Sequence, residues 1–386
     1  MSKLKFALLI VFMFPCIAGA KVEHPYPRLA KYFLHPRIWD KAWVEELAKW
    51  DVVILDMEVQ AEPQDIELLR KLNPDIVILA YITSEEFLPE LTGEDYPLRT
   101  EILSNIKENW WLKDTQGNKI SAWDDTSRMF TMSFDWSDFL AKFLDANVIK
   151  SGLWDGLFYD CVWEEVSWVN SGNIDMDNNG IKDNPESLDK EWKNRVEYLL
   201  SKTVQYLGES FLLVGNGPSR SYYHYLNGIM LEEFPAVYAG GWEGSMEHYQ
   251  RCMEKARSPR VCFVASDGEK EDYRMMRFTL TCCLLGDGYF SYDRPGSHTS
   301  FWWYDEYDAS LGYPKAKAYK LESGVFRRDF DKGIVFCNPT LKTQRIVLEK
   351  AFRKIKGDQE PVINDGSEVS EVTIASKDGI ILLNAN

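Results

Sequence analysis

The sequence lacks the signatures of several common enzyme classes. Its five histidines are scattered and form no H-E-x-x-H pair, which argues against zinc catalysis. It contains no G-x-S-x-G elbow, so a serine nucleophile of the α/β-hydrolase kind is not expected. No glycine-rich turn follows the first apolar strand pattern, which weakens the case for a nucleotide-binding sheet. We therefore expect no organic cofactor.

Cysteines with metal-type or redox-type spacing are also missing. Six of the seven cysteines lie beyond residue 20, mostly in apolar segments and without C-x-x-C spacing. Buried free thiols are therefore expected, and one long-range disulfide is the alternative in an exported chain. The six are Cys161, Cys252, Cys262, Cys282, Cys283 and Cys337.

The chain has fewer basic than acidic residues. The chain has 44 Lys and Arg against 60 Asp and Glu, which gives a net charge of −16. Removal of residues 1–20 would delete two lysines and no acids, so −16 becomes −18. An acidic surface disfavours nucleic acid, anionic membranes and polyanionic polysaccharides as partners. Neutral or cationic substrates fit better.

Residues 1–20 have the pattern of a secretory signal peptide. Lys3 and Lys5 precede an apolar run at 6–14, and residues 18–20 form an A-x-A exit. The run is too short to span a membrane, and no later segment is long enough. We expect cleavage after Ala20 and a secreted or periplasmic monomer without membrane contact after signal removal.

Aromatic residues are unusually abundant. The chain has 14 Trp, 19 Tyr and 20 Phe, more than a core of this size requires. Trp and Tyr offer flat apolar faces with a polar edge, which suit the C–H faces of sugar rings. A large core with decorated loops is the alternative explanation.

Short apolar runs alternate with amphipathic helical stretches from residue 30 to about 290. Several runs are apolar on both faces, as buried parallel strands are. Repeated strand–helix units of this length predict an α/β fold, a (β/α)8 TIM barrel, with an open doubly wound sheet as the alternative. Nine candidates compete for its eight strands: 31–34, 51–56, 76–82, 129–133 (the weakest), 156–160, 211–216, 228–233, 261–266 and 288–293.

Helical patterns separate these runs, at 39–50, 136–150, 188–207 and 246–257. In the first, Trp39, Trp43, Leu47 and Trp50 share one stripe. After about residue 315 the helical pattern stops, and short strand patterns alternate with Asp, Gly, Asn and Pro turns. We therefore expect a catalytic barrel at 21–314 and a small C-terminal all-β, sandwich-like domain at 315–386.

Carboxylates and amides end several predicted strands, where the active site of such a barrel lies. Asp160 ends GLFYD, and Glu232 and Glu233 close GIMLEE. Adjacent strand residues point to opposite sides, so one of the two glutamates is expected to face the barrel mouth. Asn216 ends a strand between these sites. A helix cap at Asp160 and a turn at Asn216 are the structural alternatives.

Two carboxylates across a cleft are what glycoside hydrolysis requires, since one protonates the leaving oxygen and the other attacks the sugar or activates water. The sequence therefore predicts a secreted glycoside hydrolase acting on a polysaccharide or oligosaccharide. A sugar-binding barrel without catalysis and a calcium-dependent interaction protein are the alternatives. Predicted substrate contacts are Asn216, Asp56, Tyr81, Trp163, Asp293 and the aromatic-loop residues Trp302 and Trp303.

Eight short motifs together resemble those of a known family. They are WWLKDTQGNKI, WDGLFYD, VGNGPSR, GIMLEEF, GYFSYD, YDEYDASLGYP, GVFRRDF and GIVFCNPT. In these motifs the chain resembles the TIM barrels of hypothetical glycosyl hydrolase family 15. The resemblance spans roughly residues 28–345 and implies glycoside hydrolase activity. Polygalactosaminidase-like barrels are more distantly similar. They imply an acid pair of Asp160 with Glu232 or Glu233, and Glu232 is favoured because it comes first after the apolar run.

The stretch DMDNNGIKDNPE (175–186) fits the EF-hand calcium loop pattern D-x-[DN]-x-[DN]-G-x5-E. It lies in an insert at 170–187, between the strand ending at Asp160 and the next helix. The segment before it is too short and polar for an EF-hand helix, and no second copy exists. A structural Ca²⁺ clip is therefore predicted, with a solvated acidic turn as the alternative. The expected ligands are Asp175, Asp177, Asn179, Ile181, Asp183 and Glu186.

Overall fold

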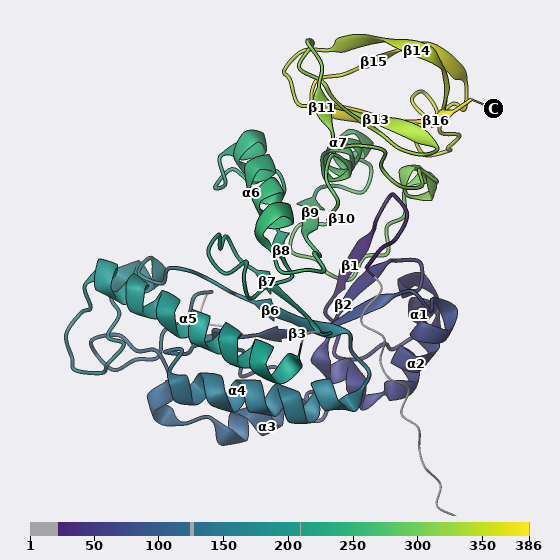
Figure 1. Ribbon diagram of the computed structural model, residues 1–386. Helices are drawn as coiled ribbons and strands as arrows, with labels where there is room; N and C mark the ends of the chain where they lie inside the picture. Colours follow the sequence, from purple (N-terminus) through teal and green to yellow (C-terminus); the bar gives the residue numbers. More distant parts are fainter. Residues whose placement is uncertain (1–21, 124–126, 209, 386) are drawn as a thin grey trace, which may run out of the picture.

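The computed structural model describes residues 22–123, 127–208 and 210–385. Eight parallel strands form one sheet (Figure 1). The sheet closes on itself, because the Phe290 N–H donates to the Arg28 carbonyl at 2.9 Å and Leu29 pairs with Phe290 in a parallel bridge. The predicted (β/α)8 barrel is therefore confirmed, and the alternative of an open sheet is wrong. Its strands, in order around the barrel, are β1 (Ala30–Phe33), β2 (Val52–Asp56), β3 (Val77–Thr83), β6 (Gly156–Asp160), β7 (Leu212–Asn216), β8 (Gly228–Leu231), β9 (Phe263–Asp267) and β10 (Tyr289–Asp293).

The ninth strand candidate, at 129–133, lies outside the barrel. Strand β3 pairs directly with β6, which leaves no place between them. Residues Arg128–Met129 instead form β5, which pairs antiparallel with β4 (Glu86–Phe87) in a separate two-stranded sheet. The candidate therefore has β structure, but its partner is a loop strand of the β3–β6 connection.

The barrel strands are apolar on both faces because both faces are buried. On β2, Val52 and Ile54 belong to the cluster that fills the barrel interior. Val53 and Leu55, between them in sequence, belong to the cluster beneath the helices. This alternation follows from the two-residue repeat of a strand. It explains why the sequence shows continuous apolar runs instead of alternating ones.

Seven helices lie in the described part of the barrel, and several begin at side-chain caps. Asp40, Ser133, Asn184 and Asp272 each accept a hydrogen bond from a first-turn N–H of α1, α4, α5 and α7 respectively. Residues 217–227, between β7 and β8, contain no helix. The helices are α1 (Lys41–Leu47), α2 (Pro63–Leu72), α3 (Pro97–Asn105), α4 (Phe134–Asn147), α5 (Pro185–Leu207), α6 (Gly241–Lys255) and α7 (Tyr273–Leu284).

The predicted helix at 39–50 is longer than the one observed. Because Asp40 caps α1, Trp39 stays outside the helix and is 57% exposed. Leu47 and Trp50 are buried as the stripe predicted, although Trp50 lies beyond the helix end. None of the helices in the described ranges is long and apolar enough to cross a membrane. The signal-peptide prediction for residues 1–20 falls outside the described residues.

The C-terminal part is a six-stranded antiparallel β domain, as predicted. Its sheet order is β11-β12-β13-β16-β14-β15, around its own apolar cluster. All six cysteines beyond residue 20 are buried and free, and the Sγ atoms of Cys282 and Cys337 lie 3.4 Å apart between the barrel and this domain. The strands are β11 (Tyr319–Lys320), β12 (Phe326–Asp329), β13 (Gly333–Asn338), β14 (Gln344–Lys354), β15 (Glu368–Ile374) and β16 (Asp378–Asn384).

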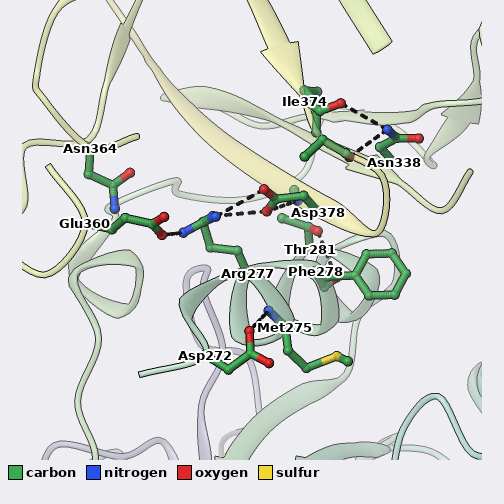
Figure 2. Close-up of polar contacts among 12 residues, drawn as sticks. Asp272, Met275, Arg277, Phe278, Thr281, Asn338, Glu360, Asn364, Ile374 and Asp378 are labelled. Atoms are coloured by element: carbon green, nitrogen blue, oxygen red, sulfur yellow. Dashed lines mark hydrogen bonds and ion pairs between the residues drawn. The ribbon is translucent and has the colours of Figure 1, made fainter. Parts of the chain in front are cut away.

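Helix α7 joins the two parts. It packs on β16 and β13, and a Cβ at Gly379 would meet the Thr281 hydroxyl oxygen at 2.0 Å, so the close approach requires glycine. Figure 2 shows Arg277 of α7 reaching Asp378 of β16 through two hydrogen bonds of 3.1 Å. Arg277 also pairs with Glu360. A buried guanidinium with these partners ties the barrel to the β domain.

We predict that Arg277→Met destabilises the protein by about 3 kcal/mol, because it leaves the buried Asp378 carboxylate without its counter-ion. Urea unfolding measures the change. The control is Arg345→Met, which removes an exposed pair with Glu371 and should cost about 1 kcal/mol or less. Equal losses in the two variants would contradict a special role for the Arg277 pair.

Candidate active site

Asp160 lies at the end of β6, where a short turn begins. Its Oδ2 accepts a hydrogen bond from the Tyr81 hydroxyl at 2.7 Å. Its Oδ1 accepts from the Asn216 amide and from the Cys161 backbone N–H, both at 2.9 Å. Three donors from three segments therefore fix the position of the carboxylate. Tyr81 and Asn216, both predicted substrate contacts, are the neighbours that orient it.

Glu232 follows β8 directly and lines the same cavity as Asp160. Burial raises the pKa of Glu232 to about 7, and the nearby negative charge of Asp160 adds to the increase. A hydrogen bond from Asn216 acts in the opposite direction. Asn216, which donates to Asp160, lines the cavity together with both acids. Three donors hold Asp160 in place, whereas burial is the main cause of the raised pKa of Glu232.

The cavity between these acids has a volume of about 380 Å³. It opens at the carboxyl ends of the barrel strands, where a barrel of this type holds its active site. A second cavity of about 910 Å³ adjoins it and also contains Glu232. The residues common to both are Tyr32, Trp123, Met230, Glu232 and His298.

Glu233 lines only the second of these cavities, whereas Glu232 lines both. The expectation that the two glutamates point to opposite sides rested on strand alternation, but β8 ends at Leu231, before both of them. Glu233 has a φ of 53°, a conformation that residues other than glycine rarely adopt. Cys161, directly after Asp160, has a φ of 58°. Asp160 and Glu232 are thus each followed by a strained residue, a feature that clusters at functional sites.

Asp293 and Asp267 end the neighbouring strands β10 and β9 and line the second cavity. Asp293 pairs with the buried Lys31 of β1. Burial raises the pKa of Asp267 to about 6, and the charges of Glu233 and Asp293 contribute. The predicted contact residue Asp293 therefore belongs to an acidic wall of the second cavity, with its own charge balanced by lysine.

Asp56 also ends a barrel strand, but it does not line either cavity. Its carboxylate accepts from the buried Arg99 guanidinium at 2.7 Å and from the Glu58 N–H at 2.9 Å. Both partners hold η1 (Met57–Ala61) and α3 against the barrel. The structure therefore places this predicted substrate contact in a buried ion pair.

The aromatic loop at 302–308 lies apart from the two cavities. Trp303 packs edge-on against Trp50 and Tyr307, at centroid distances of 5.5 and 5.4 Å. Trp302 is partly buried and lies 6.2 Å from Tyr292. Trp163, by contrast, lines the Asp160 cavity as predicted for a substrate contact. Of the three predicted tryptophans, the structure brings only Trp163 to the acids.

Glu85 and Glu86 were missed by the sequence reasoning. Glu86 lines the Asp160 cavity, and the fully buried Glu85 accepts from the Trp163 N–H at 2.8 Å. Burial raises the pKa of both carboxyl groups. Two adjacent acids shortly after the apolar strand pattern at 76–82, separated from it by Thr83 and Ser84, were the available signal.

The predicted calcium loop folds around Asp175. The two Asp175 carboxylate oxygens accept from the N–H groups of Asn179 and Gly180 at 2.9 and 2.7 Å. Gly180 has a φ of 81°, as the sharp turn requires. Asp183 accepts from the Met176 N–H, while Ile181 and Glu186 are exposed. Within the described ranges, no three acidic, His or Cys side chains converge as a metal site, so calcium stays a prediction.

Sequence comparison identifies the family of this chain. Residues 70–334 match the model of hypothetical glycosyl hydrolase family 15, which is more than half of the 386-residue chain. The chain belongs to this family. The matched segment contains Asp160, Asn216 and Glu232, and it confirms the resemblance drawn from the motifs. Membership assigns the protein to the glycoside hydrolases. A search of curated proteins finds no match.

Solved structures show the same fold at very low sequence identity. The noncanonic maltogenic alpha-amylase AmyB from Thermotoga neapolitana has a TM-score of 0.54 at 7% identity, covering 93% of this chain and 99% of that chain. A trehalulose synthase mutant in complex with Tris has a TM-score of 0.53 at 9% identity, covering 93% and 100%. These similarities establish the barrel architecture for family 15 and nothing about its substrate.

We predict that Glu232 makes stability depend on pH. Because its pKa is higher in the folded protein than the usual 4.5, its ionisation opposes folding. Its favourable contribution is complete below pH 4.5 and is lost as the pH rises through about 7. The free energy of unfolding should therefore fall less over this range in Glu232→Gln than in the wild type.

Urea unfolding at several pH values measures this difference. Glu45→Gln is the control, because this exposed glutamate of α1 lines neither cavity, and the variant should follow the wild type. If Glu232→Gln and the wild type lose the same free energy between pH 4.5 and 7, the raised pKa is refuted.

Proposed function

We propose that the protein hydrolyses O-glycosidic bonds in a polysaccharide or oligosaccharide at the Asp160–Glu232 cavity. Asp160 acts as nucleophile or water-activating base, and Glu232 acts as general acid. The observation that carries the proposal is the shared cavity, which is lined by both carboxyl groups and by Asn216, a donor to Asp160. Such a pair is what glycosidic bond cleavage needs.

The environment of each acid fits its proposed role. Glu232 holds a proton near neutral pH, so it can protonate the leaving oxygen as the glycosidic bond breaks. Asp160 accepts from Tyr81, Asn216 and the Cys161 N–H, which orient its oxygens toward a single position. The three donors stabilise the negative charge with which it attacks the sugar or removes a proton from water.

The walls of the cavities restrict the substrate. Glu232, Glu233, Asp267 and Asp293 line the second cavity, and the whole chain carries a net charge of −16. A polyanionic glycan would be repelled here, whereas neutral or cationic sugars would not. We also propose that the protein works after export, consistent with the signal pattern at 1–20.

We predict that Asp160→Asn lowers kcat/KM by about a thousandfold or more, because the amide can neither attack nor accept a proton. Reducing-end release from neutral and amino-sugar polysaccharides measures it. Asp145→Asn, on α4, is the control and should retain wild-type activity.

Full activity in a folded Asp160→Asn protein would refute the assignment. Glycan binding by the wild type without release of reducing ends would favour the alternative of a sugar-binding barrel without catalysis.

We further propose that the loop at 175–186 binds Ca²⁺ as a structural clip. The ligand pattern is complete in the sequence, and each Asp175 oxygen retains a lone pair beyond its backbone hydrogen bond. The loop also pairs with the β3–α4 connection through the Lys113–Asp175 bridge. Bound calcium would therefore stiffen two loops that flank the active site.

We predict that calcium raises the melting temperature of the wild type and that EDTA reverses the increase. Asp175→Asn should abolish the response, while Asp145→Asn should keep it. An unchanged melting temperature and unchanged activity after chelation would refute the clip.

A further inference from the structure

An aromatic cleft lies beside the catalytic cavity. It has a volume of about 690 Å³ and is built from the β3–β6 connection, the loops after β6 and β7 and the segment after β8. Four of its residues also line the Asp160–Glu232 cavity, so the two spaces are continuous. These four are Trp123, Trp163, Pro218 and Tyr238, and Trp168, Glu164, Glu165 and Arg220 complete the cleft.

Three of the four aromatic rings of the cleft are exposed, and the fourth, Trp163, is buried. Three tryptophans in the described part of the chain are about half exposed, namely Trp39 (57%), Trp123 (49%) and Trp168 (52%). Two of the three line this cleft, and Tyr238 there is 64% exposed. Exposed rings gathered in one concave site do not gain the free energy of burial in a core. Such a group of rings is typical of a surface that a ligand covers.

The rings hold one another in place. Trp163 lies between the other two tryptophans, with its centroid 5.0 Å from Trp168 and 5.8 Å from Trp123, both edge-on. The Trp168 indole N–H donates to the Glu165 carbonyl at 3.1 Å. The Tyr238 hydroxyl donates to the Glu232 carbonyl at 3.3 Å, which links the cleft to the general acid.

Hydrogen bonds fix the loop that carries these tryptophans. The N–H groups of Val166 and Ser167 both donate to Asp189 of α5 at 2.8 Å. Glu164 accepts from the Ser221 N–H at 2.7 Å and so ties the loop to the β7–β8 connection. A Cβ at Gly217 would meet the Val162 carbonyl oxygen at 2.7 Å, so these loops approach too closely for any other residue. The cleft is therefore preorganised.

We propose that this cleft is a second sugar-binding subsite that holds units of a glycan chain beyond the scissile bond. The proposal rests on the glycoside hydrolase function and extends it to a substrate class: chains of several sugars, bound across the catalytic pair. Exposed indole and phenol faces stack on the C–H faces of pyranose rings, while Glu165 and Arg220 can bind hydroxyls at the rim. Continuity with the catalytic cavity selects a glycan over a protein partner.

Chain-length-dependent binding tests the subsite. Binding is measured by calorimetry on the full-length Asp160→Asn protein, because this substitution prevents cleavage of the probe. The probes are disaccharides and hexasaccharides of the malto, cello, laminari, manno, N-acetylchito and chitosan series. At least one hexasaccharide should bind about tenfold more tightly than its disaccharide, because only the longer chain reaches the cleft. Adding Trp168→Ala should remove that tenfold gain and leave disaccharide binding unchanged.

Trp39→Ala is the matched control, because it removes an equally exposed tryptophan outside the cleft and should keep the gain. The subsite is refuted if no hexasaccharide binds more tightly than its disaccharide, or if Trp168→Ala keeps the difference. Wild-type hydrolysis is measured separately on the same chains. Cleavage without length-dependent binding refutes the subsite alone, and length-dependent binding without cleavage refutes the proposed activity alone.

Discussion

Closure of the parallel sheet is the constraint on which the candidate active site depends. Pairing of Leu29 with Phe290 brings the first and last strands together, so the carboxyl ends of all eight strands surround one opening. Asp160, Asn216 and Glu232 lie at the carboxyl ends of three consecutive strands, and closure gives them a common cavity. The interior beneath them is filled by apolar side chains. Burial at this end of the barrel is the main cause of the raised pKa of Glu232.

Much of the fold could be predicted because buried segments show a local pattern of apolar residues in the sequence. Each barrel strand is buried on both faces, so each appears as a short apolar run, and the β domain appears as a change of period after residue 315. The run at 129–133 shows the same apolar pattern, and its first residue belongs to a strand, but the partner of that strand is β4. Strand propensity is local, whereas the choice of partner depends on the rest of the chain.

The candidate site, like the fold, could be predicted only in part. The rule that active-site groups end barrel strands identified Asp160, Asn216 and Glu232. The same rule selected Asp56, which a buried arginine on a distant helix had already neutralised. It also missed Glu86, which reaches the cavity through a two-residue strand in a loop. Position along a strand can be read from the sequence, but the counter-ion of a carboxylate cannot.

Helix α7 determines how this chain could have been assembled. Every residue from Met276 to Leu284 is buried, since one side of the helix covers β9 and β10 and the other faces β16 and β13. A barrel cut away from the β domain would expose the face of α7 that β13 and β16 cover, and would leave the buried Arg277 without its partner Asp378. The two parts are therefore one cooperative unit, and gene fusion or domain exchange at this boundary would require α7 to be rebuilt.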